Sequence, residues 1–410
     1  MRILIAEDEA ITRMTLSRQL RSWGHEVTAA EDGQQAWDIL GGDAEFDIVI
    51  TDWEMPRMSG VELVGRFRRT TRASYTYCIL LTSRSEKADV VNGIEAGADD
   101  FLSKPFDRDE LRVRLLAGER IVRLERTLNK QNADLREANE RVHGGLRAAA
   151  RVQQSMLPRG NVVTPSVRTA WRYVPTDELA GDAIGLHLID GRHLAAYVLD
   201  VSGHGVPAAL LSVSAMHALE PLPAETSLLR DLTNGAANGN TMQRPGRVAS
   251  ELNRRFRAGE YDGRYLTLSL CALDTTDGRL SITSAGHPPP ILLRSGHAIE
   301  VPDAGGFPIA MFDAADYDDA VLQLTPGDRL CLYSDGIIEQ FDPADAQFGS
   351  ARFLEALASR AHLPPEQVVA EIVDDLKAWA GGPSFGDDVS IVVIDWLGPA
   401  SARETGRDAG

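Results

Sequence analysis

The sequence predicts an α/β domain with a doubly wound parallel sheet, then a helical coiled-coil linker, then an α+β domain of layered sheets flanked by helices. Over about the first 116 residues, short and continuous apolar runs alternate with helical patterns. Continuous apolarity is typical of strands that are buried on both faces of a parallel sheet. Beyond Pro158 the chain is rich in strand-like runs, and a polar, helix-favouring stretch lies between the two regions.

A length of 410 residues accommodates two or three domains. We place them at residues 1–117, 118–155 and 156–397, with a disordered tail at 398–410. In the first region the predicted strands are 3–6, 27–30, 47–51, 78–82 and 100–103. In the third, the predicted strands are 194–200, 265–273, 280–284, 291–293, 329–334 and 389–394, and the predicted helices are 207–219, 248–256, 350–361 and 366–379. Residues 233–246 are rich in glycine and asparagine, which predicts a mobile loop.

The linker carries an imperfect heptad pattern. One set of positions spaced seven apart is largely apolar, and a second set three residues later includes a glutamine and a glycine. The pattern predicts a dimeric coiled coil, and a solvated connecting helix is the alternative. The two sets are Ile121, Leu128, Leu135, Val142 and Ala149, and Leu124, Gln131, Ala138, Gly145 and Val152.

Composition excludes several classes of protein. Lys and Arg number 42 against 60 Asp and Glu, a net charge of −18, which argues against a nucleic-acid-binding protein. No apolar stretch approaches the roughly 18 residues of a membrane helix, and the first residues do not resemble a signal peptide. Cys78, Cys271 and Cys331 lie in apolar runs without paired spacing, which predicts buried thiols in a reducing cytoplasm and neither disulfides nor zinc.

Acidic residues follow the predicted strands of the first region. Glu7 and Asp8 come after the first strand, and Asp52 comes after the third. The carboxyl ends of parallel strands converge on one crevice, and carboxylates gathered there repel one another unless a cation lies among them. Oxygen ligands at an open site suit Mg²⁺. Asp52 lies centrally, so it is the predicted nucleophile toward a phosphoryl donor.

Three further residues belong to this crevice. Lys104, before a candidate cis Pro105, is placed to contact phosphoryl oxygens. Thr82 offers a hydroxyl that could follow a new phosphate, and the ring of Phe101 could report it by its packing.

The segments AEDE, TDWEMPRMSG, LLTSR and SKPF, in this order, resemble the response-regulator receiver domain of two-component signalling over about residues 1–120. The resemblance implies strand order 2-1-3-4-5 and a sensor histidine kinase or phosphotransfer protein as partner. It implies that Asp52 is the phosphoacceptor, that Glu7, Asp8, Asp52 and the backbone carbonyl of Glu54 hold Mg²⁺, and that Thr82, Phe101 and Lys104 form the switch. Glu7 stands where the family more often has Asp. A receiver that only packs and takes no phosphate is the alternative.

In the third region, aspartates beside glycines end several apolar runs. Glycine lets the backbone approach an ion closely, and widely spaced carboxylates without cysteine suggest Mg²⁺ or Mn²⁺. Four or more carboxylates exceed the need of one ion and suggest a binuclear site. Asp-Gly is also a common turn, so spacing leaves both interpretations open. The residues concerned are Asp182, Asp200, Asp335, Asp387 and Asp388.

The segments AARVQQSMLP, LAGD, LDVSGHGVPAALLSV, SAGHPPPILL, LYSDGIIE and FGDDVSIVV resemble the PPM-type, metal-dependent protein serine/threonine phosphatases of the sporulation and stress-response branch, over about residues 148–396. The resemblance implies that Asp200 bridges two Mn²⁺ or Mg²⁺ ions and that the carbonyl of Val201 binds one of them. It implies that Asp182, Asp335 and Asp387 complete the site, and it leaves the role of Asp388 open.

One position departs from the family. Gly185 stands where a further aspartate is common, three residues after Asp182, which we interpret as a subfamily variant with weak or lost activity as the alternative. Ser202, His204 and His287 lie in matching segments, where we expect satisfied loop residues and keep a proton donor as the other possibility.

Together the resemblances imply a cytoplasmic, homodimeric response regulator whose phosphorylation controls a phosphatase acting on a phosphorylated anti-sigma-factor antagonist, with no nucleic-acid or membrane partner. A non-enzymatic adaptor that binds a sigma factor or its antagonist is the competing class, although such adaptors usually lose the metal carboxylates. A DNA-binding output is a third option that no basic surface supports. The sign of regulation stays open.

Overall fold

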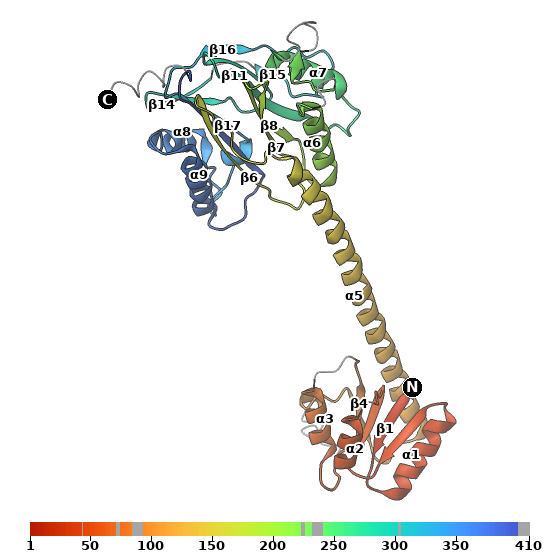
Figure 1. The fold of residues 1–410 in the computed structure, drawn as a ribbon. Coiled ribbons are helices and arrows are strands. Elements are labelled where there is room, and N and C mark those ends of the chain that lie inside the picture. Colours follow the sequence, from red (N-terminus) through yellow and green to blue (C-terminus); the bar gives the residue numbers. More distant parts are fainter. Residues whose placement is uncertain are drawn as a thin grey trace. The chain divides into compact units, whose positions relative to one another are not determined.

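The computed structural model describes residues 1–42, 44–70, 74–83, 93–222, 226–231, 241–301 and 305–400. The chain forms two compact units, which divide between Arg141 and Val142. Figure 1 labels many of the elements of both units along the chain.

The amino-terminal unit is built on a five-stranded parallel sheet in the order β2-β1-β3-β4-β5. This confirms the predicted sheet and its order. The strands are β1 Arg2–Ala6, β2 Glu26–Ala30, β3 Ile48–Asp52, β4 Tyr77–Thr82 and β5 Asp100–Ser103; the helices are α1 Ala10–Ser22, α2 Gly33–Leu40 and α3 Gly60–Arg68.

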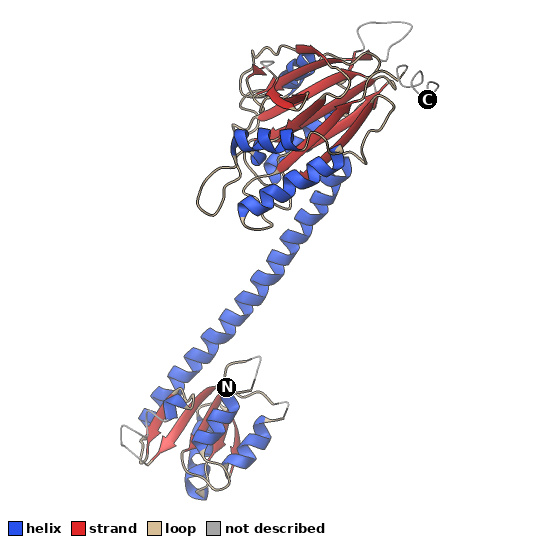
Figure 2. Ribbon diagram, turned by 90° about the vertical axis from the view of Figure 1, so that its left-hand side faces the viewer, coloured by secondary structure: helices blue, strands red, loops and turns tan. Residues whose placement is uncertain are grey.

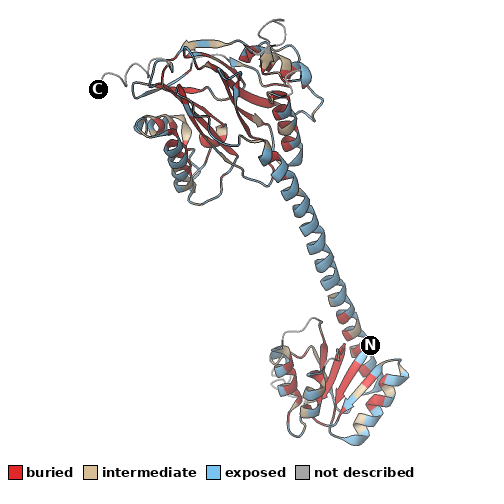
Figure 3. Cartoon of the chain, viewed as in Figure 1, coloured by how far each residue is buried: buried red, intermediate tan, exposed pale blue. Residues whose placement is uncertain are grey.

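The three central strands of this sheet, β1, β3 and β4, are buried on both faces. One core contains Ile3 and Ile5 with α1 and the start of α5, and the other contains Leu4 and Ala6 with α2 and α3. Consecutive strand residues therefore face opposite cores, which explains the continuous apolar runs in the sequence. The central strands are mostly coloured as buried in Figure 3.

Helix α5 spans Arg108–Met156, a length of 49 residues. Its first turns pack on the amino-terminal core through Leu111, Leu115 and Val122. Most of the remaining helix is exposed along its length (Figure 3). The helix begins ten residues before the predicted linker, because its first turns are also the last helix of the amino-terminal unit.

The carboxyl-terminal unit contains two packed sheets with helices on their outer faces, as Figure 2 shows. One sheet has the order β15-β12-β11-β8-β7, with β16 also paired to β12, and the other has the order β14-β13-β17-β18-β6. The strands are β6 Val167–Val174, β7 Ala183–Ile189, β8 His193–Val201, β11 Leu266–Asp274, β12 Arg279–Ala285, β13 Ile291–Arg294, β14 His297–Glu300, β15 Gly305–Gly306, β16 Ala320–Gln323, β17 Arg329–Tyr333 and β18 Val389–Trp396. The helices are α6 Val206–Leu219, α7 Pro245–Arg255, the short η1 Asp335–Ile337, α8 Gly349–Ser359 and α9 Pro365–Ala380.

Three cores hold these layers together. Residues of both sheets, such as Val198 and Val392, form the core between the sheets. Helices α6 and α7 cover the first sheet, and α8 and α9 cover the second. This arrangement confirms the predicted layered sheets with flanking helices.

Several predictions about single elements have clear outcomes. The six predicted strands and four predicted helices of the third region are confirmed within a few residues, and all three cysteines are buried. β6, β7, β14, β15 and β16 were not predicted, and in β6 Arg168 and Arg172 interrupt the apolar residues. The end of the predicted loop at 233–246 is wrong, since Thr241–Met242 pairs as β10 with β9 (Arg230–Asp231) and α7 begins at Pro245.

Residues 233–240 of that loop and 401–410 of the predicted tail lie outside the described residues. Among the described residues, none of the helices combines the length and apolarity needed to cross a bilayer.

Candidate functional sites

The first candidate site lies at the carboxyl edge of the amino-terminal sheet. Glu7 and Asp8 directly follow β1, and Asp52 is the last residue of β3, which pairs with β1 and β4. Carboxylate oxygens of these three residues lie within 4.8 Å of one another, and no other such acidic or His/Cys group occurs among the described residues. Parallel pairing alone brings the three together, as the sequence predicted.

Lys104 reaches into this acidic group. Its Nζ lies 2.7 Å from both Glu7 Oε2 and Asp52 Oδ2. Burial opposes the charge of Lys104, but its hydrogen bonds to Asp52 and Glu7 raise its pKa. Burial raises the pKa of Glu7 as well, against the hydrogen bond from Lys104. The other oxygen of Asp52, Oδ1, accepts a hydrogen bond of 2.8 Å from the Trp53 backbone, which fixes the carboxylate.

The other predicted receiver residues surround this pocket. Thr82 is the last residue of β4, one position beyond the partner of Asp52. Phe101 is half-buried on β5, and the Arg114 guanidinium lies 5.9 Å from its ring centre. Glu54 is exposed, two residues after Asp52. The Lys104–Pro105 peptide bond is cis.

Gly60 lies against Asp52 and was not predicted as a residue of this site. A Cβ on Gly60 would lie 2.0 Å from the Asp52 carbonyl oxygen, so only glycine fits this close approach. Its presence in the segment TDWEMPRMSG was the available signal. Three clustered oxygen ligands, one of them buried, fit a small hard cation such as Mg²⁺.

The second candidate site lies at one end of the two packed sheets. Asp200 is near the end of β8 in one sheet, whereas Asp335 follows β17 and Asp387 precedes β18 in the other. These three carboxylates and Val201 line a cavity of about 560 Å³. Ser202, His204, Thr267 and Asp388 line it too. Four of the predicted metal-site residues therefore share one cavity.

The carboxylates of this cavity oppose one another's ionisation. Burial, with the nearby charges of Asp335 and Asp387, raises the pKa of Asp200 to about 7. Burial and Asp387 also raise the pKa of Asp335. Such shifts are the signature of carboxylates whose charge lacks a counterion. A bound cation would remove this penalty, so the donor set fits hard divalent ions.

Asp182 lies directly before β7 and is not among the residues that line the cavity. It is 2% exposed, and its burial and the charge of Asp200 raise its pKa well above the ordinary value. Its Oδ2 atom has no hydrogen-bond partner among the described residues. A buried carboxylate oxygen without a partner is costly, so it too fits a cation as ligand. Gly181 beside it permits a close approach, since a Cβ there would lie 2.8 Å from the Val201 carbonyl oxygen.

Asp388, whose role the sequence left open, binds backbone amides. Its Oδ1 accepts a hydrogen bond of 2.8 Å from the Thr176 amide, and its Oδ2 accepts one of 2.9 Å from the Gly181 amide. It thereby fixes the loop that carries Asp182. The segment after β17 and the segment before β18 approach each other closely here. A Cβ on Gly336 would lie 2.1 Å from the Asp388 carbonyl oxygen.

His287 is a satisfied buried residue, as expected. Its Nε2 donates to the Tyr333 carbonyl at 2.9 Å, so its Nδ1 is the acceptor for the Thr267 hydroxyl at 2.7 Å. Burial lowers its pKa to about 4, which keeps the ring neutral. Ser202 Oγ accepts a hydrogen bond from the Tyr265 amide. His204 is exposed at the cavity, with Nδ1 3.9 Å from Asp177.

Gly185 has a packing reason in this chain. It pairs with Tyr197 across β7 and β8, and a Cβ on Gly185 would lie 1.9 Å from Cε1 of that buried ring. Tyr197 therefore occupies the space that an aspartate side chain would need. Gly185 is not among the residues that line the cavity.

The two units match two known families. Residues 3–116 match the response regulator receiver domain, and residues 190–397 match the family Stage II sporulation protein E (SpoIIE). The second match covers half of the chain. The chain belongs to the SpoIIE family. Its amino-terminal unit is a receiver domain, and its carboxyl-terminal unit contains the SpoIIE-family domain.

Individual relatives match one unit each. The receiver domain is 40% identical over 121 residues to the response regulator RppA of Synechocystis, which covers 29% of this chain and 51% of RppA. It is 34% identical over 116 residues to a chemotaxis protein CheY homologue of Campylobacter jejuni, covering 28% of this chain and 89% of that protein. The chain thus spans about half the length of RppA. The SiaA-PP2C domain of Pseudomonas aeruginosa matches with a TM-score of 0.52 at 21% identity, over 63% of this chain and 98% of that domain, which shows a shared fold.

Proposed function

We propose that this protein is a two-component response regulator in which phosphorylation of Asp52 controls a metal-dependent phosphoserine and phosphothreonine phosphatase. The observation that carries the proposal is the convergence of Asp200, Asp335 and Asp387 from two sheets on one cavity, in a chain that also has a receiver domain. We propose domains at 1–117 and 156–397, joined by a coiled-coil linker at 118–155. We also propose a cytoplasmic location.

In the receiver domain, Asp52 would attack the phosphorus of the donor, whose bond to the leaving group breaks as the acyl phosphate forms. Lys104 already binds Asp52 Oδ2 and would move its contact to a phosphoryl oxygen. Glu7, Asp8, Asp52 and the Glu54 carbonyl would hold Mg²⁺. Thr82 and Phe101 flank the pocket as its switch residues.

In the SpoIIE-family domain, Asp200 would bridge two Mn²⁺ or Mg²⁺ ions, with Asp182, Asp335, Asp387 and the Val201 carbonyl as further ligands. When bound, such ions activate a water molecule and compensate the charge of the phosphoryl group. Asp388 is not one of the ligands in this proposal, because both of its oxygens accept backbone hydrogen bonds. It holds the Asp182 loop in place.

The substrate we propose is a phosphorylated anti-sigma-factor antagonist, so that dephosphorylation would release a sigma factor by partner switching. The competing proposal is an adaptor that only binds such a partner. Release of p-nitrophenol from p-nitrophenyl phosphate, measured with and without Mn²⁺, separates the two. The enzyme proposal predicts hydrolysis that requires the metal, and its absence under both conditions favours the adaptor.

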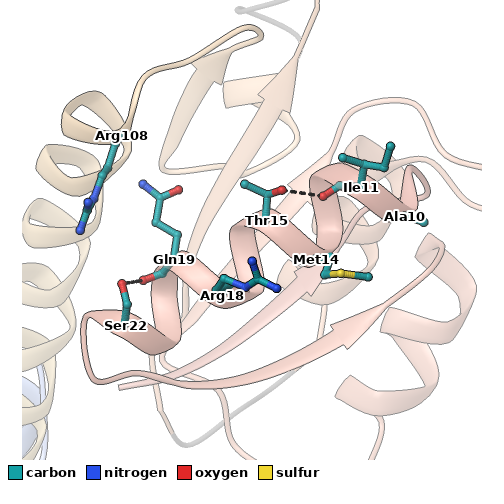
Figure 4. Close-up of a pocket in the computed structure, with 8 residues that line it drawn as sticks. All are labelled: Ala10, Ile11, Met14, Thr15, Arg18, Gln19, Ser22 and Arg108. Atoms are coloured by element: carbon teal, nitrogen blue, oxygen red, sulfur yellow. Dashed lines mark hydrogen bonds between the residues drawn. The ribbon is translucent and has the colours of Figure 1, made fainter.

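The phosphodonor protein would dock beside the Asp52 pocket. Helix α1 exposes Ile11 and Met14 on a hollow of about 560 Å³, which Figure 4 shows together with Arg108. A neighbouring hollow of about 480 Å³ is lined by Ile11, Lys104 and Arg108. Since Lys104 also contacts Asp52, this apolar surface is continuous with the phosphorylation pocket. A helix of the donor protein would cover it.

The end of α5 is placed to carry the signal into the SpoIIE-family domain. Gln153 is buried there, and its Nε2 donates to the Ala180 carbonyl at 2.7 Å while its Oε1 accepts from the Ala180 amide at 3.4 Å. Ala150 packs against Leu179 beside it. The helix thus holds one side of the loop before Asp182, and Asp388 holds the other side. A shift of α5 would move this loop.

Changing Gln153 to Leu should therefore uncouple the two domains. The variant leaves both polar groups of Ala180 buried without their partner, so the loop loosens and turnover falls several-fold. The ratio of activities with and without receiver phosphorylation should approach one. Gln154→Leu is the matched control, because Gln154 is exposed on the same turn and should leave that ratio unchanged. Equal ratios in the wild-type chain and Gln153→Leu would contradict this path.

Changing Leu128 and Leu135 together to Glu should separate the proposed dimer. Both lie at the same heptad position of α5 and are 52% and 67% exposed in the single chain, so a second copy would cover them. Charges placed in that seam would lose their hydration. Light scattering should show half the wild-type mass, whereas Ala133→Glu on the opposite face keeps it. An unchanged mass in the double variant would count against the dimer.

A further inference from the structure

Exposed apolar residues lie at the start of helix α6, which begins two residues after His204 of the metal cavity. The helix has the sequence VPAALLSVSAMHAL, without Lys, Arg, Asp or Glu, and Leu210 on its outer face is 62% exposed. Val206 and Pro207 are exposed on the same face. The solvent face of a helix ordinarily carries charged or polar side chains. Apolar surface beside a reaction site indicates a contact with another molecule.

The start of α6 forms one wall of a preformed hollow of about 260 Å³. Pro207 and Leu210 line it on the side of α6, and Tyr261 and Arg264 line it on the other side. The second wall is fixed, because the Tyr261 ring packs 5.7 Å from the buried ring of Phe256. The Arg264 amide also donates to the Tyr261 carbonyl at 3.0 Å.

On both walls, residues that line the hollow lie close in sequence to residues that line the metal cavity. On one wall, His204 lines the cavity and Pro207 lines the hollow. On the other wall, Tyr265 lines the cavity and Arg264 lines the hollow. The Tyr265 amide donates to Ser202 Oγ at 3.0 Å, which joins the two walls at the border.

We propose that this hollow receives an apolar side chain of the substrate protein, carried by a residue that flanks the phosphorylated serine or threonine. The inference rests on the proposed phosphatase function and adds a feature of its substrate. A phosphorylated side chain in the cavity places its own neighbouring residues on the cavity rim, near the residues that line the hollow. Leu210 and Pro207 offer apolar contact there. The far wall carries two carboxylates, Glu260 and Asp262, against one guanidinium, Arg264, which is paired with Asp262 at 3.7 Å, so its net charge disfavours an acidic side chain.

The test uses the full chain with Mn²⁺ and a set of phosphoserine peptides in which a single leucine replaces alanine at successive positions around the phosphoserine. One leucine position should raise kcat/KM by about tenfold, mainly through a lower KM, as expected for one well-fitting apolar side chain. Leu210→Glu should abolish that gain. Hydrolysis of p-nitrophenyl phosphate by the same variant should stay within about twofold of wild type, because this small substrate does not reach the hollow.

Ile299→Glu is the matched control, since Ile299 is 52% exposed on the edge strand β14 and lines neither cavity nor hollow. It should keep the leucine preference. Equal kcat/KM for all peptides, or a parallel fall of peptide and p-nitrophenyl phosphate hydrolysis in Leu210→Glu, would overturn the inference. If the wild-type chain hydrolyses neither substrate, the proposed function itself is wrong and the inference falls with it.

Discussion

Changing Asp200 to Asn should lower the turnover of the manganese-loaded chain by about 100-fold or more, the scale of losing a main electrostatic stabiliser. Asp200 lies among Asp335, Asp387 and Asp388, and burial with these charges raises its pKa to about 7. A carboxylate that is hard to ionise without a counterion is one that a bound cation stabilises strongly. Its loss should therefore weaken metal binding as well as catalysis.

The fold should survive this change, because removing one charge from an acidic cluster relieves repulsion in the metal-free chain. Turnover with a phosphoserine peptide and calorimetric titration with Mn²⁺ measure the two effects. Asp374→Asn is the matched control, since Asp374 is an exposed residue of α9 and does not line the cavity. Near-normal turnover in both Asp200→Asn and Asp335→Asn, at the Mn²⁺ concentration used for the wild-type chain, would refute the binuclear mechanism.

Changing Asp52 to Asn should abolish labelling of the chain by acetyl phosphate or a cognate kinase. Asp52 is the last residue of β3, its Oδ2 contacts Lys104, and an amide there is no nucleophile. Glu7 is no substitute, because it is fully buried beside the same lysine.

Intact-mass measurement after incubation with acetyl phosphate and Mg²⁺ checks this prediction. Asp38→Asn is the matched control, an exposed aspartate on α2 whose variant should be labelled as the wild type is. Undiminished labelling of Asp52→Asn would defeat the assignment of the phosphoacceptor.

The receiver pocket could be predicted from the sequence because parallel strands bring their carboxyl ends to one edge. Glu7, Asp52 and Lys104 each follow or end a continuous apolar run, so their meeting needs only the order of the strands. The pocket of the SpoIIE-family domain is different. Asp200 and Asp335 come from separate sheets. Strand order could not predict that they share a site, and the prediction rested on the resemblance to a known family.

Some contacts of the second site have no local pattern in the sequence that would predict them. Asp388 accepts a hydrogen bond from Gly181, 207 residues away in the chain, and Gln153 binds the backbone of Ala180. Contacts from a side chain to a distant backbone depend on the packed fold and have no characteristic spacing. β6 was missed for another reason, because Arg168 and Arg172 interrupt its apolar residues where it pairs with β18.

The central claim is that the phosphorylation state of Asp52 sets the rate of the phosphatase. The direct measurement is the hydrolysis of a phosphoserine peptide by the full chain with Mn²⁺, before and after receiver phosphorylation by acetyl phosphate, in the wild type and in Asp52→Asn. The account predicts that phosphorylation changes the wild-type rate by at least about fivefold, the lower range of typical coupling between sites, and leaves the Asp52→Asn rate unchanged. Equal wild-type rates in the two states, with labelling of Asp52 confirmed by mass, would contradict it.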